Sequence, residues 1–207
     1  MKSKHPGTVG SDAQAFQQIS SRFQSEVGRI VSSIDFVRGP VPFWALMRMM
    51  FPVAESLGDL IYRKDRKDQS TAQNLRSILE NEFEAIRPGY RGKAAVLAVL
   101  YRHSLTHHDE LRTIASNGKE VGWSVSGADD ANHLQLRRTG ASLILIEFQP
   151  RAFYADIVGV CKKAEESNRR GEVMRRYNGW MALDLDSEIR KKRNGTFAAA
   201  RTELAAF

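Results

Sequence analysis

Three of the five histidines in the chain fall within six residues, beside an arginine, in the stretch YRHSLTHHDE at 101–110. An arginine offers a fixed fork of donors to phosphate oxygens, and histidine changes its charge near neutral pH. Together such groups can bind an RNA phosphate, take the proton from a 2′-hydroxyl and protonate the leaving oxygen without a metal ion. No other part of the sequence is as dense in such groups, so an active site is expected in the segment Arg102–His108.

The same stretch also allows a metal site. His103 and His107 have the i, i+4 spacing of two zinc ligands on one helical face, and His108, Asp109 or Glu110 can supply a third ligand. However, no glutamate follows the first histidine and no second cluster of ligands is evident. Metal binding is therefore the minor alternative, and no metal or cofactor is predicted.

A purely structural interpretation stays open as well. Tyr101 fits a core position better than a catalytic one. The run 107–110 fits a polar helix end, although acidic residues there oppose the helix dipole. Arg102 can pair with an acid of the preceding helix, Glu82 or Glu84.

The elements that must position this segment are mostly helical. Apolar residues recur at three- and four-residue steps, which is the spacing of one helical face. Pro52 predicts a kink or a split in the second helix. The expected helices cover about 13–37, 43–62, 71–87, 91–108 and 150–168.

Between the fourth and fifth of these helices the period changes to two. Apolar residues alternate with small or polar ones around Trp123 and around Leu136, and residues 142–148 form a continuous apolar run. The pattern predicts a three-stranded antiparallel β-meander at 119–149, with His133 in its second strand. The fold class is therefore α+β and mostly α: a bundle of about five helices with the meander inserted after the fourth.

A chain of 207 residues fits one domain. We expect a flexible lead-in at 1–12, a single domain at 13–183 that includes the meander, and a basic tail at 184–207. The net charge of +7 and the sequence pI near 9.7 favour a polyanionic partner.

The chain has a single cysteine, Cys161, so no intrachain disulfide can form, and its helical neighbours predict a buried hydrophobic position. The first twelve residues lack the apolar segment of a signal peptide. No run approaches 18 apolar residues, so no membrane span is predicted. A cytoplasmic location is the expectation.

The string RHSLTH at 102–107 resembles the signature of the HEPN superfamily, an arginine followed by a polar residue and then a histidine four to six residues after the arginine. Its position near the end of a helix is also similar. The preceding FWALMRMMFPVAESLGDLIY (43–62) and TAQNLRSILE (71–80) resemble uncharacterised bacterial HEPN-like proteins that carry a small β-meander after the motif. The resemblance covers roughly residues 40–165.

This resemblance implies a metal-independent endoribonuclease of a toxin or phage-defence kind, which cleaves RNA through attack by the 2′-hydroxyl. By the same resemblance, Arg102 is the phosphate-binding arginine, His103 the polar residue after it, and His107 the catalytic histidine. His108 also fits the permitted spacing. Positions five apart lie about 140° apart on an ideal helix, so either the last turn frays or both side chains line one wide cleft.

The resemblance also implies a homodimer in which two motifs face each other. RNA, a second copy of the chain and an antitoxin or other partner protein are the partners expected, with no membrane and nothing that indicates DNA specifically. The alternative function is a catalytically inactive HEPN-like scaffold, or an RNA- or protein-binding module, that acts as a dimer.

Other candidate residues are weaker. The acids at 184–188 adjoin the basic tail and fit charge compensation. The RKKR run at 190–193 fits a solvated helix face better than a basic surface that binds RNA. Trp123 and Trp180 can stack on bases, although the alternation around Trp123 favours core packing.

Overall fold

The computed structural model describes residues 9–35, 43–63, 71–101, 113–124, 130–167, 169 and 171–181. The chain forms two compact units. The larger unit spans Phe16–Ser167, and the smaller unit combines Met1–Ala15 with Asn168–Phe207.

The described residues form six continuous helices, where the sequence analysis predicts about five. Two of them pass through a π-helical turn, at Gln24–Gly28 and at Leu79–Phe83, so that each joins two α-helical segments. The sixth, α8, lies in a stretch that the sequence analysis assigns to no helix. The α-helical segments are α1 (Asp12–Phe23), α2 (Arg29–Ser33), α3 (Phe43–Tyr62), α4 (Thr71–Ile78), α5 (Glu84–Ile86), α6 (Ala94–Leu100), α7 (Pro150–Glu165) and α8 (Glu172–Met181). None of the helices in the described ranges is long and apolar enough to cross a membrane.

Helix α3 is the central helix of the larger unit. It runs unbroken through Pro52, which contradicts the predicted split. Pro52 and Arg48, whose carbonyl loses its helical partner, both lie on the exposed side of α3, where water can replace the lost bond. On the buried side, Gly58 faces the backbone of Asn74, and a Cβ there would lie 2.6 Å from the Asn74 carbonyl oxygen. The missing side chain therefore lets α3 and α4 cross closely.

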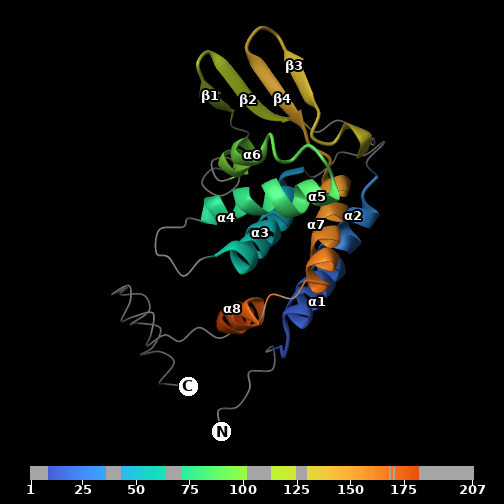
Figure 1. Cartoon of the computed structure of the whole chain (residues 1–207). Coiled ribbons are helices and arrows are strands. Elements are labelled where there is room, and N and C mark those ends of the chain that lie inside the picture. The colour runs from blue at the N-terminus through green and yellow to red at the C-terminus, as the bar shows by residue number, and fades with distance from the viewer. Residues whose placement is uncertain are drawn as a thin grey trace, which may run out of the picture. The chain divides into compact units, whose positions relative to one another are not determined.

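The sheet has four strands and mixed direction, so the predicted three-stranded antiparallel meander is wrong. Strands β1 (Ile114–Ser116), β2 (Lys119–Ser124), β3 (Leu136–Thr139) and β4 (Leu143–Glu147) lie in the order β1-β2-β4-β3. The outer pairs are antiparallel hairpins, and β2 pairs with β4 in parallel. Apolar alternation reveals which residues are buried but not which strand lies beside which. Figure 1 shows the sheet at one end of the unit, next to α6.

An aromatic cluster joins the sheet to the helices. The ring of Phe51 in α3 lies 4.8 Å from that of Tyr101, 5.6 Å from Trp123, 5.7 Å from Phe148 and 4.8 Å from Phe153, measured between ring centroids. Each such aromatic pair contributes about 0.5–1.5 kcal/mol beyond the burial of its apolar area. One side chain of α3 thus holds the end of α6, strand β2 and the start of α7 in one core.

In the smaller unit, Asp12 caps the start of α8. Its carboxylate accepts hydrogen bonds from the backbone N–H groups of Gly171 and Met174, at 2.9 and 2.7 Å. Asn178 exchanges hydrogen bonds with the backbone of Val9, at 2.8 and 2.9 Å. These contacts tie the start of the described chain to its last described helix.

Candidate functional site

The described chain reaches the predicted active segment at Tyr101, which follows α6. The Tyr101 side chain is buried and stacks on Phe51 with an angle of 12° between the rings. Its hydroxyl donates a hydrogen bond of 3.3 Å to Oε2 of Glu55. The residue before Arg102 is therefore fixed against α3 by a ring stack and a hydrogen bond. The core position predicted for Tyr101 is confirmed.

The predicted site residues themselves, Arg102, His103, His107 and His108, lie outside the described residues. Asp109 and Glu110, offered as further metal ligands, lie outside them as well, and so do the acids at 184–188 and the RKKR run. The part of the chain that the structure describes contains no group of three His, Cys, Asp or Glu side chains placed to hold a metal ion.

The loop before α6 is organised by Glu84. Its Oε2 accepts hydrogen bonds from the backbone N–H groups of Gly89 (2.9 Å) and Arg91 (2.8 Å). These bonds, that of Arg91 first, hold the pKa of the Glu84 carboxyl below its ordinary value. Gly89 takes a positive φ of 116° that favours glycine. The helix predicted to begin at residue 91 therefore begins at Ala94.

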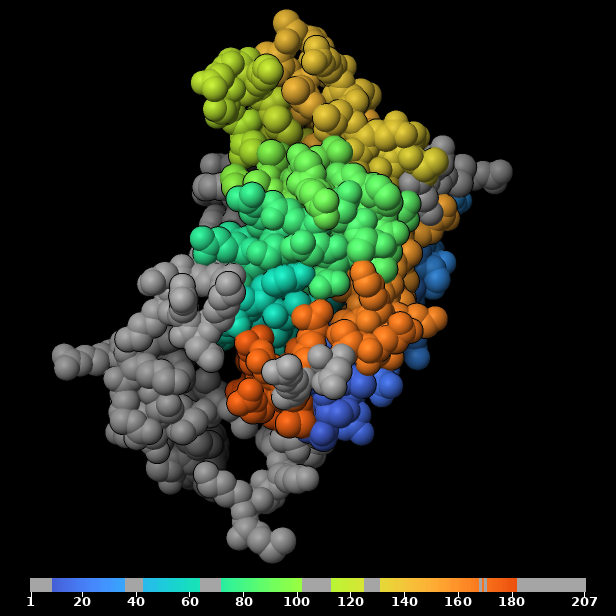
Figure 2. Space-filling model, viewed as in Figure 1, coloured from blue at the N-terminus to red at the C-terminus, as the bar shows by residue number. Residues whose placement is uncertain are grey.

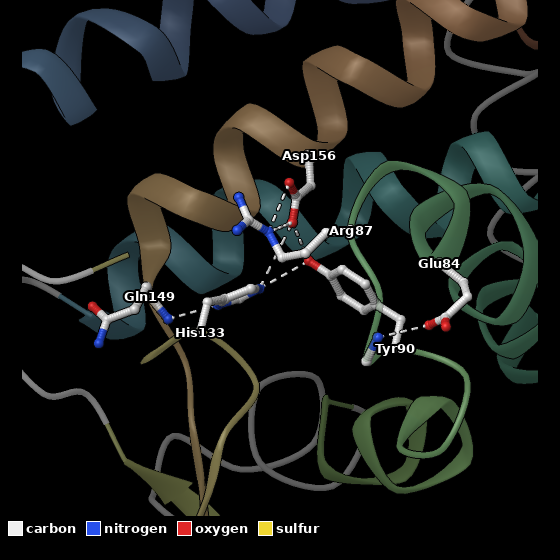
Figure 3. Close-up of polar contacts among 7 residues, drawn as sticks. Glu84, Arg87, Tyr90, His133, Gln149 and Asp156 are labelled. Carbon is white, nitrogen blue, oxygen red and sulfur yellow. Dashed lines mark hydrogen bonds and ion pairs between the residues drawn. The ribbon is translucent and has the colours of Figure 1, made fainter. Parts of the chain in front are cut away.

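Below this loop lies a buried polar network of four side chains (Figure 3). The Tyr90 hydroxyl donates to Oδ2 of Asp156 at 2.7 Å and lies 2.9 Å from Nε2 of His133. Nε of Arg87 donates to both oxygens of Asp156, at 3.1 and 2.9 Å. The backbone N–H of Gln149 donates to Nδ1 of His133 at 2.9 Å. The network thus joins the loop before α6, the turn before β3 and helix α7.

The hydrogen bonds fix the protonation state of His133. Because Nδ1 accepts from Gln149, the proton of the neutral ring is on Nε2 and points to the Tyr90 oxygen. Burial, and then the nearby Arg87 charge, lower the pKa of His133 to about 3. At neutral pH the 3.9 Å separation between Nε2 and Asp156 is therefore not an ion pair.

Tyr90 and Asp156 complete the network. Burial, and then the charge of Asp156, raise the pKa of Tyr90 well above its ordinary value, so the phenol keeps its proton. Asp156 carries the negative charge and Arg87 balances it, with 34% of the Arg87 side chain exposed. The Tyr90 hydroxyl, both ring nitrogens of His133 and both carboxylate oxygens of Asp156 each bond to another protein group, so the arrangement supports structure rather than proton transfer to a substrate.

The sequence analysis missed this network. It places His133 in a strand, whereas His133 follows a short 3-10 turn at Asp130–Asn132 and precedes Leu134, which has a positive φ of 68°. One signal was available: Asp156 lies on the apolar face of α7, between Phe153 and Ile157. A carboxylate at such a position requires a buried partner.

Other predicted features have clear outcomes in the described residues. Cys161 is buried as predicted, and burial raises the pKa of its thiol to about 12, so it is inert as a nucleophile. Trp123 packs in the core and is not available for stacking on bases. Of the two acids offered as partners for Arg102, Glu84 binds the loop backbone and Glu82 accepts a hydrogen bond of 2.9 Å from Tyr62.

Comparison of the chain with protein-family models, with curated proteins and with solved structures gives no match.

Proposed function

We propose that this protein is a metal-independent endoribonuclease of the HEPN kind, with its active site in the segment Arg102–His108. One observation carries the proposal. The string Arg-His-Ser-Leu-Thr-His begins at the residue after Tyr101, and Tyr101 is locked against Phe51 and Glu55 of α3. Because Tyr101 is held in place, the chain enters the proposed site from a fixed point. Catalysis that depends on positioning a phosphate needs such a fixed point.

The reaction proposed is an intramolecular transfer within the RNA. The 2′-oxygen attacks the adjacent phosphorus as a histidine, His107, takes its proton. The bond from phosphorus to the 5′-oxygen breaks, and that oxygen is protonated, by the same histidine or by His103 or His108. Arg102 neutralises the charge that develops on the phosphate oxygens. The products are a 2′,3′-cyclic phosphate and a free 5′-hydroxyl.

The excess of positive charge supports this substrate class, because a polyanion is attracted to a chain of net charge +7. The remaining parts of the proposal rest on the HEPN resemblance. They are a homodimer that brings two motifs together, and a toxin or defence role with an antitoxin or other partner protein. Action in the cytoplasm is proposed from the sequence expectation alone.

The test uses the full chain and an end-labelled structured RNA, with and without EDTA. Arg102→Ala and His107→Ala are compared with Arg76→Ala, an exposed arginine that pairs with Glu80 in α4 and its π-turn. We expect cleavage that survives EDTA, leaves cyclic phosphate ends, and falls about a hundredfold or more in the first two variants only.

Three outcomes contradict the proposal. Cleavage that EDTA abolishes and zinc restores indicates the metal site at His103 and His107 instead. RNA binding by a folded dimer without cleavage indicates the catalytically inactive module. Equal cleavage by the Arg102→Ala variant and the wild type assigns the activity to a contaminant.

A further inference from the structure

Among the described residues, no strand pairs with the outer edge of β3. β3 is the last strand in the order β1-β2-β4-β3, and all four of its residues are exposed. Leu136 is the most exposed large hydrophobic residue of the described chain, with 58% of its surface accessible. Figure 1 shows β3 as the outermost strand, and Figure 2 shows the sheet uncovered on the face in view.

The hydrogen-bond register determines which backbone groups point outward. The N–H of Glu147 donates to the carbonyl of Gln135 at 2.8 Å, and its carbonyl accepts from Leu134 at 2.6 Å. Leu134 and Gln135 therefore face Glu147 together, as a β-bulge at a hydrogen-bonded pair. In an antiparallel ladder such pairs recur every second residue, so Arg137 and Thr139 also bond to β4. The N–H and C=O groups of Leu136 and Arg138 therefore point away from the sheet.

The hydrogen bonds between β4 and β2 lead to the same assignment of outward groups in β3. The carbonyl of Ser142 accepts from Glu120, and the N–H of Phe148 donates to Ser124, so the even-numbered residues of β4 bond to β2. The odd-numbered residues are left for β3. The outward groups of Leu136 and Arg138 are thus open to a fifth strand.

Two arginines follow Leu136 in β3, one with its charge paired across the sheet and one exposed. The Arg137 side chain is 57% exposed and contacts Glu147 through Nε (2.7 Å) and Ser124 through a terminal nitrogen (2.8 Å). Arg138 is exposed and has no ion-pair partner among the described residues. In two-fold pairing of β3 with β3 of a second copy, a register centred on Arg137 or on Arg138 sets that arginine against its own counterpart, and like charges directly opposite are destabilising. A register centred on Leu136 avoids this, and the experiment below tests it through its dependence on protein concentration.

We infer that the free edge of β3 binds an extended acidic segment of a partner protein as a fifth strand. The outward N–H and C=O groups supply the strand-like hydrogen bonds. Arg138 favours an acidic residue opposite it, and Leu136 favours an apolar one. The Arg137 side chain is 57% exposed beside its partner Glu147, so it can share a second acidic residue opposite position 137. From its N- to its C-terminus, an antiparallel segment therefore carries an acidic residue opposite Arg138, an acidic residue opposite Arg137 and an apolar residue opposite Leu136. This inference is independent of the proposed ribonuclease, because it uses no residue of the segment Arg102–His108.

The experiment uses the full chain and a fluorescein-labelled peptide, Thr-Thr-Glu-Glu-Val-Thr-Thr, with a Lys-Lys version in place of Glu-Glu. Amide hydrogen exchange is measured by NMR with and without peptide. Addition of the acidic peptide should protect the amides of Leu136 and Arg138. Those of Arg137 and Thr139, already bonded to β4, should change little.

Fluorescence anisotropy tests the role of charge. The acidic peptide should bind at least about fivefold more tightly than the Lys-Lys peptide, and Arg138→Glu should reverse that preference. Leu136→Pro removes an outward donor that the sheet does not use, which edge strands tolerate. It should weaken binding more than Leu136→Ala, which keeps the N–H.

Several outcomes overturn the inference. Equal protection of all four amides, or no protection at saturating peptide, rules out strand addition. Equal binding of both peptides removes the charge argument. Protection of Leu136 and Arg138 that rises with protein concentration alone assigns the edge to a second copy, and protection by RNA but not by peptide assigns it to nucleic acid.

Discussion

The hydroxyl of Tyr90 lies between Nε2 of His133 and Oδ2 of Asp156, and it reaches His133 at 2.9 Å although 43 residues separate the two in sequence. This contact joins the loop that leads into α6 to the turn that leads into β3. The loop before α6 and the turn before β3 therefore share one buried polar contact.

Removal of the hydroxyl in Tyr90→Phe should lower the free energy of unfolding by about 1–3 kcal/mol, because the Nε2–H of His133 and one acceptor site of Asp156 are left buried without a partner. Urea unfolding followed by circular dichroism measures the change. Tyr154→Phe is the matched control. No described residue bonds to the Tyr154 hydroxyl, so its effect should stay within about 0.5 kcal/mol. Equal effects of the two variants would show that the network adds no stability.

His133 should make the protein less stable in acid. Its folded-state pKa of about 3 lies below the ordinary value of 6.5, so the unfolded chain binds the proton first as the pH falls. The contribution is complete above pH 6.5 and declines toward pH 3, with a slope of up to about 1.4 kcal/mol per pH unit. Urea unfolding at several pH values should give a shallower slope for His133→Asn. Parallel slopes for variant and wild type would contradict a neutral buried histidine.

Glu84→Gln should loosen the loop before α6. The neutral amide keeps one acceptor oxygen but loses the charge that strengthens its bonds to Gly89 and Arg91. We expect faster hydrogen exchange at these two amides and a loss of about 0.5–1.5 kcal/mol. Glu80→Gln, which removes the half-buried carboxylate that pairs with the exposed Arg76, should cost less than about 0.5 kcal/mol and leave both amides unchanged. The same exchange rates in both variants would remove Glu84 from this role.

Gly58→Ala tests the close crossing of α3 and α4. The added Cβ meets backbone atoms of Asn74, at 2.6 Å from the oxygen and 2.9 Å from the carbon, so α4 has to move. The expected net destabilisation is about 1–3 kcal/mol despite the better helix propensity of alanine. The control is Gly92→Ala, where no atom lies within 4 Å of the added Cβ. A thermal midpoint as high as that of the wild type for Gly58→Ala would show that the two helices separate freely.

Local patterns predicted the helices better than the sheet. The bounds of α3 at Phe43–Tyr62 agree with the prediction because its apolar face is long and the sequence before it contains two prolines, Pro40 and Pro42. The pair Asn117-Gly118 is a strong hairpin signal, and it indicates β1, which the three-stranded prediction omits. The parallel pairing of β2 with β4 leaves no such local signal, since it joins residues far apart in sequence.

The same contrast between local signals and long-range contacts holds for the candidate site and the buried network. The histidine cluster was found because its members are close in sequence. The members of the buried network, in contrast, come from three separate segments: the loop with Arg87 and Tyr90, the turn with His133, and helix α7 with Asp156. Of these, Asp156 alone could be recognised beforehand, as an acid on an apolar helical face. Long-range polar contacts of this kind depend on the tertiary fold rather than on any spacing in the chain.

The parallel junction of β2 and β4 has a consequence for the folding pathway. Each hairpin closes over a short turn, whereas the junction joins residues such as Val121 and Ile144, 144 − 121 = 23 positions apart. Longer loops cost more entropy to close, so the hairpins should form early and the junction late. In stopped-flow chevron measurements, Val121→Ala should therefore mainly speed unfolding, and Gly118→Ala, at a positive φ of 72°, should mainly slow folding. The sheet then assembles from two preformed hairpins, β1-β2 and β3-β4, which join last through the pairing of β2 with β4.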